Sequence, residues 1–405
     1  MTNIFCNSVG AIHELPLHCD EKPYNHFYCN IQKSMSNEFR QLLQKVGSGT
    51  HTSEHLTRAE ASQAMAMILE EKATPTQIGA FLIAHRIKRP TGEELAGMLD
   101  AYTSLGPQLA HHPSGLTTTV FGIPYDGRTR TLPLAPITAL LLAAVGVPVI
   151  MHGGERMATK EGLPLIEIWQ GLGIDFSQLS LKNTQEVFNQ TGLGFIYLPR
   201  HFPLTTNLVK YRWEIGKRPP IATMELIWCP YQGKSHLISG YVHPPTAGLF
   251  RQALELREYN TFTVLKGLEG SCDLPRDRTV IIGIPPQSDS STNQGYRPDP
   301  TNGDRINEKD GLIHFFLHPP EYGYGGKEIP LKSDAEAIHD LHQILQGQAG
   351  EPLAAAIWNG GFYLWHCGIS DNLKAGLAEA EKLLTGGKVA EQLGKIGQLI
   401  NQLIN

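Results

Sequence analysis

Apolar positions recur at helical spacing behind three capping signatures in the first quarter of the chain. Thr57, Thr74 and Thr91 are each followed three residues later by Glu or Gln, which is the pattern of an N-terminal capping box. The apolar residues behind these caps repeat every three or four positions, as on the buried face of a helix: Ala64, Met67, Ile68, Ile78, Phe81, Leu82, Leu95, Met98 and Leu99. Together with a helix in "MSNEFRQLLQKVG", they predict a small helical domain over residues 36–110.

The pattern changes to buried strands after this domain. "GLTTTVFGI" predicts a strand, residues 136–145 an apolar helix, and "VPVIMHGG" a second strand, which together make a βαβ unit. Further strands are predicted at "GLGFIYLP", "SHLISGYV", "TFTVLKG" and "RTVIIGI". Further helices are predicted at 163–173, from Ser333 onward, over 351–368 and over 371–404.

The predicted fold class is therefore α/β, with a small N-terminal helical domain and a larger α/β domain over residues 111–405. A mostly parallel central sheet is expected, because strands alternate with helices. The polar stretch 285–311 is rich in Gly and Pro, so we expect a long surface loop inserted into this domain.

Composition narrows the classes of partner. The 405 residues carry a formal charge of −5 with a pI of about 6.4, so no global basic excess favours nucleic acid or a membrane surface. Six cysteines form no CxxC pair, and we expect reduced thiols in a cytoplasmic protein. No apolar run approaches the roughly 20 residues of a membrane span, and the N-terminus lacks the pattern of a signal peptide.

Residues 1–35 differ from the rest of the chain. They are polar, rich in His and Cys, and without helical period, so we expect either a disordered extension or a translation start at Met35. A metal site is the minor alternative, because the spacing of the five candidate ligands fits no standard zinc pattern. These ligands are His13, His18, Cys19, His26 and Cys29.

The stretch "VFGIPYDGRTRTLPLAPITALLLAAVG" combines a strand end, a glycine turn, a polar loop and an apolar helix. Many proteins bind phosphate at such a helix N-terminus. Here Pro124, Pro133 and Pro136 each remove a backbone N–H donor, which weakens a phosphate cradle built from the main chain. Arg128 and Arg130 add two guanidinium groups, which bind phosphate without a tight backbone turn.

Two interpretations of these arginines remain open at this point. Either Arg128 and Arg130 face one anion together with Arg156 and Lys160, or the two loop arginines are solvated and hold no ligand. Asp126 either contacts that ligand or braces the turn. We therefore expect a small anionic ligand at this loop, with the solvated loop as the alternative.

Several segments resemble the anthranilate phosphoribosyltransferases and the related pyrimidine nucleoside phosphorylases. They include "LTRAEASQAMAMILEEKATPTQIGAFLIAHRIKRPTGEELAGM", "AAVGVPVIMHGGERMATKEG", "TGLGFIYLPRHFPLTTNLVKYRWEIGKR" and the closing helices after "ILQGQAGEPLAAAIWNGG". The similarity covers roughly residues 36–405, interrupted by the stretch 285–311. It implies the family's two-domain fold, a homodimer formed through the helical domain, a site for phosphoribosyl diphosphate and a magnesium ion.

This sequence differs from the family at the residues that bind phosphate and magnesium there. The phosphate loop Gly-Thr-Gly-Gly-Asp becomes "GIPYD" at 122–126, and Asn-x-Ser-Thr becomes "PLAP" at 133–136. Lys-His-Gly-Asn becomes "MHGG" at 151–154, and a Ser-Ser pair becomes Ala158-Thr159. The Asp-Glu pair that holds magnesium becomes Cys272-Asp273. The usual pose of phosphoribosyl diphosphate is therefore not expected here.

Candidate binding residues follow from these matches and from the charges of the loops. They are Gly122, Asp126, Arg128, Arg130, His152, Gly153, Arg156, Thr159, Lys160, His201 and Arg212. Glu269 and Asp273 are the candidate magnesium ligands and reach one ion only if their loop folds back; otherwise they are structural or surface carboxylates.

Three of these candidates have a structural alternative. His152 ends a strand at the edge where α/β proteins bind ligands, but a buried structural histidine fits equally. The resemblance favours a ligand-facing His201. Arg212 lies in the basic stretch 200–218, which is either a solvated helix face or a grip for phosphate or carboxylate, which the resemblance centres on Arg212.

Two functions from different classes follow. The first is a glycosyl- or phosphoribosyltransferase-like protein that binds an anionic sugar phosphate, acting by positioning and electrostatics if it is an enzyme. The second is a non-catalytic dimer that binds nucleic acid or another polyanion through Arg128, Arg130, Arg156 and the stretch 200–218. A dimer with a vestigial site is a third alternative.

Overall fold

The structure is a computed structural model that describes residues 37–49, 51–286 and 307–405. The predicted extension at 1–35, its His and Cys residues and most of the stretch 285–311 lie outside the described residues. Where this stretch is described again, it forms the short strand β7 rather than the predicted loop.

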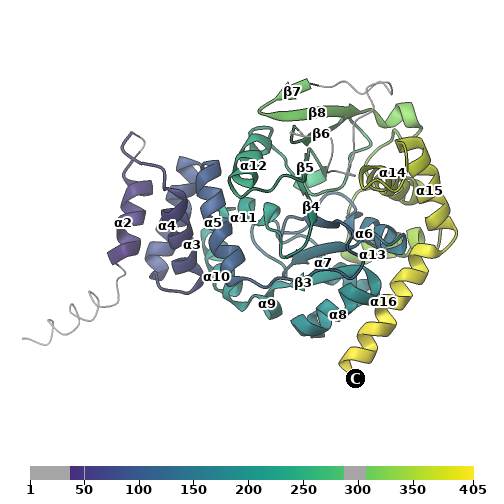
Figure 1. Ribbon diagram of the computed structural model, residues 1–405, viewed down its shortest axis with the longest axis horizontal. Helices are drawn as coiled ribbons and strands as arrows, with labels where there is room; N and C mark the ends of the chain where they lie inside the picture. The colour runs from purple at the N-terminus through teal and green to yellow at the C-terminus, as the bar shows by residue number, and fades with distance from the viewer. Residues whose placement is uncertain (1–36, 50, 287–306) are drawn as a thin grey trace, which may run out of the picture.

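The helical domain lies to one side of the α/β domain (Figure 1). All three predicted capping boxes are present, with the Thr side chain and the Glu or Gln side chain each accepting a backbone N–H. The nine apolar residues predicted to face inward are buried, which confirms the helical period. The helices of the helical domain are α2 (Asn37–Gly47), α3 (Arg58–Leu69), α4 (Pro75–Lys88) and α5 (Gly92–Leu105).

An eight-stranded sheet forms the centre of the α/β domain, in the order β3-β2-β1-β4-β5-β6-β8-β7. Strands β1 to β5 pair in parallel and the remaining strands antiparallel, which confirms the predicted mostly parallel sheet. The strands are β1 (Thr118–Gly122), β2 (Val149–Gly153), β3 (Leu193–Tyr197), β4 (Ser235–Gly240), β5 (Phe262–Leu265), β6 (Val280–Ile284), β7 (Asn307–Lys309) and β8 (Leu312–Leu317).

Helices cover both faces of this sheet (Figure 1). They are α6 (Ala135–Ala144), α7 (Leu165–Gly171), α8 (Leu181–Thr191), α9 (Leu198–His201), α10 (Thr206–Ile215), α11 (Ile221–Met224), α12 (Pro245–Leu256), α13 (Asp334–Leu345), α14 (Glu351–His366), α15 (Leu373–Thr385) and α16 (Lys388–Ile404). The single helix predicted over 371–404 is two helices, because the chain turns at Gly386 and at Gly387, whose φ is +75°. None of the described helices is long and apolar enough to cross a membrane.

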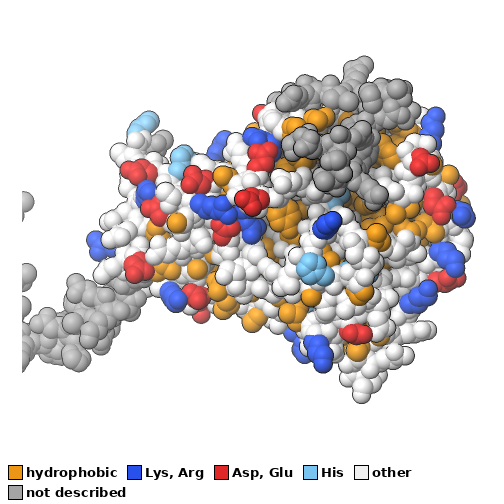
Figure 2. Space-filling view, in the orientation of Figure 1, with side chains coloured by type: hydrophobic (Ala, Val, Ile, Leu, Met, Phe, Trp, Pro, Cys, Tyr) orange, Lys and Arg blue, Asp and Glu red, His pale blue; other side chains and the backbone are white. Residues whose placement is uncertain are grey.

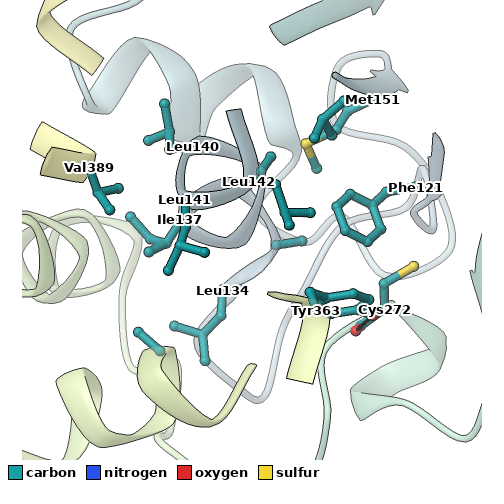
Figure 3. Packing of buried hydrophobic residues seen from close by; sticks show 14 of the residues in the cluster. Phe121, Leu134, Ile137, Leu140, Leu141, Leu142, Met151, Cys272, Tyr363 and Val389 are labelled. Atoms are coloured by element: carbon teal, nitrogen blue, oxygen red, sulfur yellow. Dashed lines mark hydrogen bonds between the residues drawn. The ribbon is translucent and has the colours of Figure 1, made fainter. Parts of the chain in front are cut away.

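The side chains of each parallel strand alternate between two hydrophobic clusters. Val120 and Ile150 pack in the cluster that also contains the buried faces of α3, α4 and α5. Phe121 and Met151 point to the opposite face, where they pack with α6 (Figure 3). One face of the sheet therefore shares a core with the helical domain.

Two short 3₁₀ turns position the candidate site. They are η3 (Glu225–Ile227), which follows α11, and η4 (Leu268–Gly270), which follows β5.

Candidate functional site

Residues 123–134 connect β1 to α6 at the carboxyl edge of the parallel strands, where α/β proteins bind ligands. Main-chain bonds fix this loop: the Arg128 N–H donates to the Leu163 carbonyl at 3.2 Å, and the Leu163 N–H donates to the Arg128 carbonyl at 2.8 Å. Gly127 has a φ of +73°, and a Cβ there would lie 2.4 Å from the backbone of Gly162. Only glycine allows this close approach of the two loops.

Gly122, at the end of β1, and Gly153, at the end of β2, are the two glycines that we predicted to approach a ligand. A Cβ on Gly122 would lie 1.8 Å from the carbonyl oxygen of Leu226, whereas a Cβ on Gly153 would meet no atom closer than 3.8 Å. Glycine is required at Gly122 because the main chain of η3 packs against it.

Arg128 is a buried part of the structure, with its side chain 3% exposed. Its Nε donates to Glu269 Oε1 at 3.2 Å and its Nη1 donates to Ser271 Oγ at 2.8 Å. Further bonds join Nη1 to Asp273 and Nη2 to Thr131. The alternative in which Arg128 is solvated is therefore wrong, and its guanidinium faces carboxylates of this chain.

Glu269 holds the loop from the other side, with a left-handed φ of +54° and a side chain that is 1% exposed. Its carboxylate accepts the backbone N–H groups of Thr129, Arg130 and Thr131 at 3.0–3.2 Å. Burial alone would raise the pKa of Glu269, but Arg128, Lys160 and these backbone donors lower it well below its usual range. Glu269 is therefore ionised, and both of its carboxylate oxygens accept hydrogen bonds from this chain.

Three cations at the rim of this network are partly exposed, and we call Arg130, Lys160 and Arg218 the outer cations. Arg130 is 73% exposed, with Nε 3.8 Å from Glu269 Oε2, and Lys160 donates to the same oxygen at 3.2 Å. Arg218 pairs with the buried carboxylate of Asp126, which gives Asp126 the bracing role. Burial lowers the pKa of Lys160, and the nearby Arg218 acts in the same direction against the two carboxylates.

Arg156 and Thr159 lie on the loop after β2 and do not join this network. Arg156 Nε donates to Glu167 Oε1 at 2.8 Å, and its Nη2 lies 2.6 Å from Asp334 Oδ2. Thr159 is exposed. The prediction of four cations around one anion is therefore wrong: Arg128 is neutralised inside and Arg156 pairs with α7 and with Asp334 at the start of α13.

Both candidate histidines are bonded through both ring nitrogens. His152 Nδ1 lies 2.7 Å from Tyr125 Oη, and its Nε2 lies 3.2 Å from the Trp228 carbonyl oxygen. His201 Nδ1 accepts the Tyr197 N–H at 3.0 Å, and its Nε2 lies 2.9 Å from the Leu179 carbonyl oxygen. His152 is therefore a buried structural histidine, which was one of its two alternatives. The resemblance implied that His201 faces a ligand, but both of its ring nitrogens are engaged by the main chain.

Arg212 is buried at the end of α10, where the sequence left open a grip on phosphate or carboxylate. Its Nη2 pairs with the buried carboxylate of Glu225, and its Nη1 lies 2.8 Å from Met157 Sδ. Tyr102 Oη donates to the same carboxylate at 3.2 Å. Arg212 therefore grips a carboxylate supplied by η3 of this chain, and the solvated-face alternative is wrong for this residue.

Two cavities border residues 123–134, one beside Arg128 and one beside Arg212. Each has a volume of about 10 Å³. That is room for about one water molecule, whereas pockets for small molecules usually measure roughly 300–1,000 Å³. Neither cavity therefore has room for a sugar phosphate.

Comparisons with known proteins show what this chain is similar to. A family model described as the helical bundle domain of the glycosyl transferase family matches residues 40–106. The anthranilate phosphoribosyltransferase of Listeria welshimeri is 26% identical over 358 residues, which cover 88% of this chain and 96% of that protein. This chain is a divergent relative of the anthranilate phosphoribosyltransferases.

Solved structures of anthranilate phosphoribosyltransferases share the fold. The Saccharomyces cerevisiae enzyme in complex with PRPP and Mg superposes with a TM-score of 0.74 at 16% identity, covering 91% of this chain and 99% of that one. The Thermus thermophilus enzyme gives a TM-score of 0.67 at 20% identity, covering 90% and 100%. The N-terminal helical bundle and the mostly parallel sheet are thus those of this family.

The carboxylates of this phosphoribosyltransferase relative do not fit a magnesium ion. Cys272, which matches the first carboxylate of the family pair, lies in the hydrophobic core beside Phe121 and Tyr363 (Figure 3). Its thiol lies 3.2 Å from the Ile238 carbonyl oxygen. Glu269 and Asp273 are both engaged by Arg128, and the described residues contain no group of three His, Cys, Asp or Glu suited to a metal.

Several residues of this network were not predicted from the sequence. Ser271 stands between the two predicted carboxylates, so its position was a usable signal, and Thr131 follows Arg128 by three residues. Tyr125 and Glu225 carry no local signal, because their partners come from distant segments.

Proposed function

We propose that this chain is a phosphoribosyltransferase-like protein that binds a small phosphate-bearing anion, such as a phosphorylated pentose, at its outer cations. The observation that carries the proposal is the exposure of Arg130, Lys160 and Arg218 around a loop fixed from within by Arg128. Buried carboxylates hold Lys160 and Arg218 in place, Arg130 lies 3.8 Å from Glu269 Oε2, and all three remain accessible to an anion from solvent.

The charge balance of the loop supports this proposal. Arg128 and the three outer cations face three carboxylates, those of Asp126, Glu269 and Asp273, so one positive charge remains. The carboxylates are buried and the surplus charge lies at the rim. An anion therefore meets guanidinium and ammonium groups first, where charge-assisted hydrogen bonds are worth about 1.5–3 kcal/mol each.

The same geometry argues against transfer of phosphoribose to anthranilate. The interior beside Arg128 and Arg212 is closed, and the arginine implied by the resemblance is occupied by Glu225. Pro124 and Pro133 remove donors from the loop that cradles phosphate in the family. We therefore propose that any catalysis by this chain is a pentosyl transfer with a different acceptor or pose, in which the chain acts by positioning.

The polyanion alternative has weaker support from the structure. In the basic stretch 200–218, Arg212 is neutralised by Glu225, Lys210 pairs with Glu71 and Arg218 pairs with Asp126. Among the described residues on the face drawn in Figure 2, cationic and anionic side chains are interspersed. Nucleic acid binding predicts a steep fall of affinity with salt, so a flat response would reject it. The homodimer through the helical domain stays a prediction.

Calorimetric titration with ribose 5-phosphate and pyrophosphate tests the proposed anion site. We expect binding by the wild type, and affinity lowered by roughly tenfold or more in Arg130→Ala and in Lys160→Met. The matched control is Lys382→Ala, which removes a 76% exposed cation from α15. No heat with either ligand, or equal affinity in Arg130→Ala and the wild type, contradicts the proposal.

A further inference from the structure

The guanidinium of Arg128 lies in a cage of four side-chain oxygens. Glu269 Oε1, Ser271 Oγ, Asp273 Oδ2 and Thr131 Oγ1 are each in hydrogen-bond contact with it. The Arg128, Glu269 and Asp273 side chains are 1–3% exposed. Carboxylate and hydroxyl oxygens in such an arrangement are also the ligands of hard divalent cations.

Both carboxylates of this cage already accept several donors from the chain. Glu269 accepts three backbone N–H groups and the ammonium of Lys160 in addition to Arg128. Asp273 Oδ2 also accepts the Leu134 N–H at 3.0 Å. A divalent ion added here would displace these donors and would face the buried charge of Arg128 at close range, which is unfavourable away from water.

We propose that Arg128 permanently takes the place of a divalent cation, so that this site is built to work without a metal. The two carboxylates need a cation inside the loop, and a side chain supplies it as part of folding. It follows that removal of the guanidinium turns the oxygen cage into a divalent-cation site. This inference concerns the cation inside the cage and does not depend on which anion binds at the outer cations.

The balance of charge distinguishes this arrangement from a weakened magnesium site. Arg128 and Lys160 together match Glu269 and Asp273, so the cage and its neighbour are neutral without a metal. In Arg128→Met two carboxylates remain against one ammonium, and a buried negative charge is unpaired. In this variant a divalent ion supplies the counter-charge that the carboxylates lack, whereas in the wild type it adds an excess of positive charge.

The first test is thermal unfolding of the full chain with and without magnesium. The second is manganese binding, which electron paramagnetic resonance detects. We expect no shift of the wild-type melting temperature with magnesium, and no bound manganese signal. Arg128→Met should melt roughly 5 °C lower, regain at least about 2 °C in saturating magnesium and bind manganese. Asp273→Asn added to Arg128→Met should abolish both gains.

The matched control is Arg276→Met, which removes another buried arginine whose carboxylate partner, Glu351, is exposed. It should lose stability without gaining a response to magnesium. If Arg128→Met folds only when magnesium is added, the proposal is supported. A manganese site in the wild type that Asp273→Asn removes overturns it, as does an Arg128→Met protein that responds to neither ion or folds in neither condition.

Discussion

Arg212 and Glu225 form a buried ion pair that joins α10 to η3, with the two side chains 4% and 3% exposed. Tyr102 of the helical domain donates to the same carboxylate at 3.2 Å, so three segments of the chain meet at Glu225. Burial raises the pKa of Glu225, although the guanidinium of Arg212 opposes this shift. The pair therefore links the helical domain to the α/β domain and leaves Arg212 no charge to offer a substrate.

The first prediction concerns the stability that this pair provides. Glu225→Gln leaves the buried guanidinium without a counter-charge, and we expect the free energy of unfolding to fall by about 3–5 kcal/mol. The double variant Arg212→Met with Glu225→Gln should recover part of this loss, because no unpaired charge remains. Urea denaturation of the wild type, both single variants and the double variant measures the coupling. Additive effects of the two single changes would contradict it.

The second prediction compares two glutamates at the same position of two capping boxes. The Glu94 side chain is fully buried and accepts the Leu56 N–H at 2.9 Å and the Lys88 ammonium, whereas that of Glu60 is 31% exposed. Glu94→Gln should therefore cost about 2–3 kcal/mol of unfolding free energy, and Glu60→Gln no more than about 1 kcal/mol. Urea denaturation measures both, and equal losses would show that burial of Glu94 does not matter.

The third prediction concerns pH. Burial lowers the pKa of His152 to about 4, with the Trp228 carbonyl opposing this shift in part, whereas an unfolded histidine titrates near about 6.5. Between these values the unfolded state binds the additional proton, so stability falls as the pH falls through this window. The loss from this residue is about 2 kcal/mol at about pH 5.

Urea denaturation at neutral and at acidic pH measures this loss in the wild type and in His152→Gln. The variant is less stable at neutral pH, because Tyr125 and Trp228 lose their imidazole partner. Its stability should nevertheless depend less on pH than that of the wild type. An unchanged dependence would show that His152 does not titrate in this window.

The helical domain could be predicted from local rules. Thr57, Thr74 and Thr91 cap their helices through neighbours three residues away, and the buried face repeats within each helix. A helix without such signals was missed: α12 begins in the Pro244-Pro245 pair, which also fits a loop.

The candidate site could be located from the sequence but its charges could not be assigned. Arg128 and Arg130 are two residues apart and differ in exposure from 3% to 73%. The difference is set by Glu269 and Asp273, which lie 141 and 145 residues beyond Arg128 and approach it only when β1 and β5 lie in one sheet. Partners this far apart leave no local pattern, so burial of one arginine could not be foreseen.

The most direct test of the account is the affinity for ribose 5-phosphate measured by calorimetry in EDTA and again with magnesium. This ligand is suitable because a single phosphate binds magnesium in solution more weakly than a diphosphate does. With Arg128 inside the cage and the outer cations free to meet the anion, we expect the same dissociation constant in both buffers. Binding that requires magnesium would contradict the account.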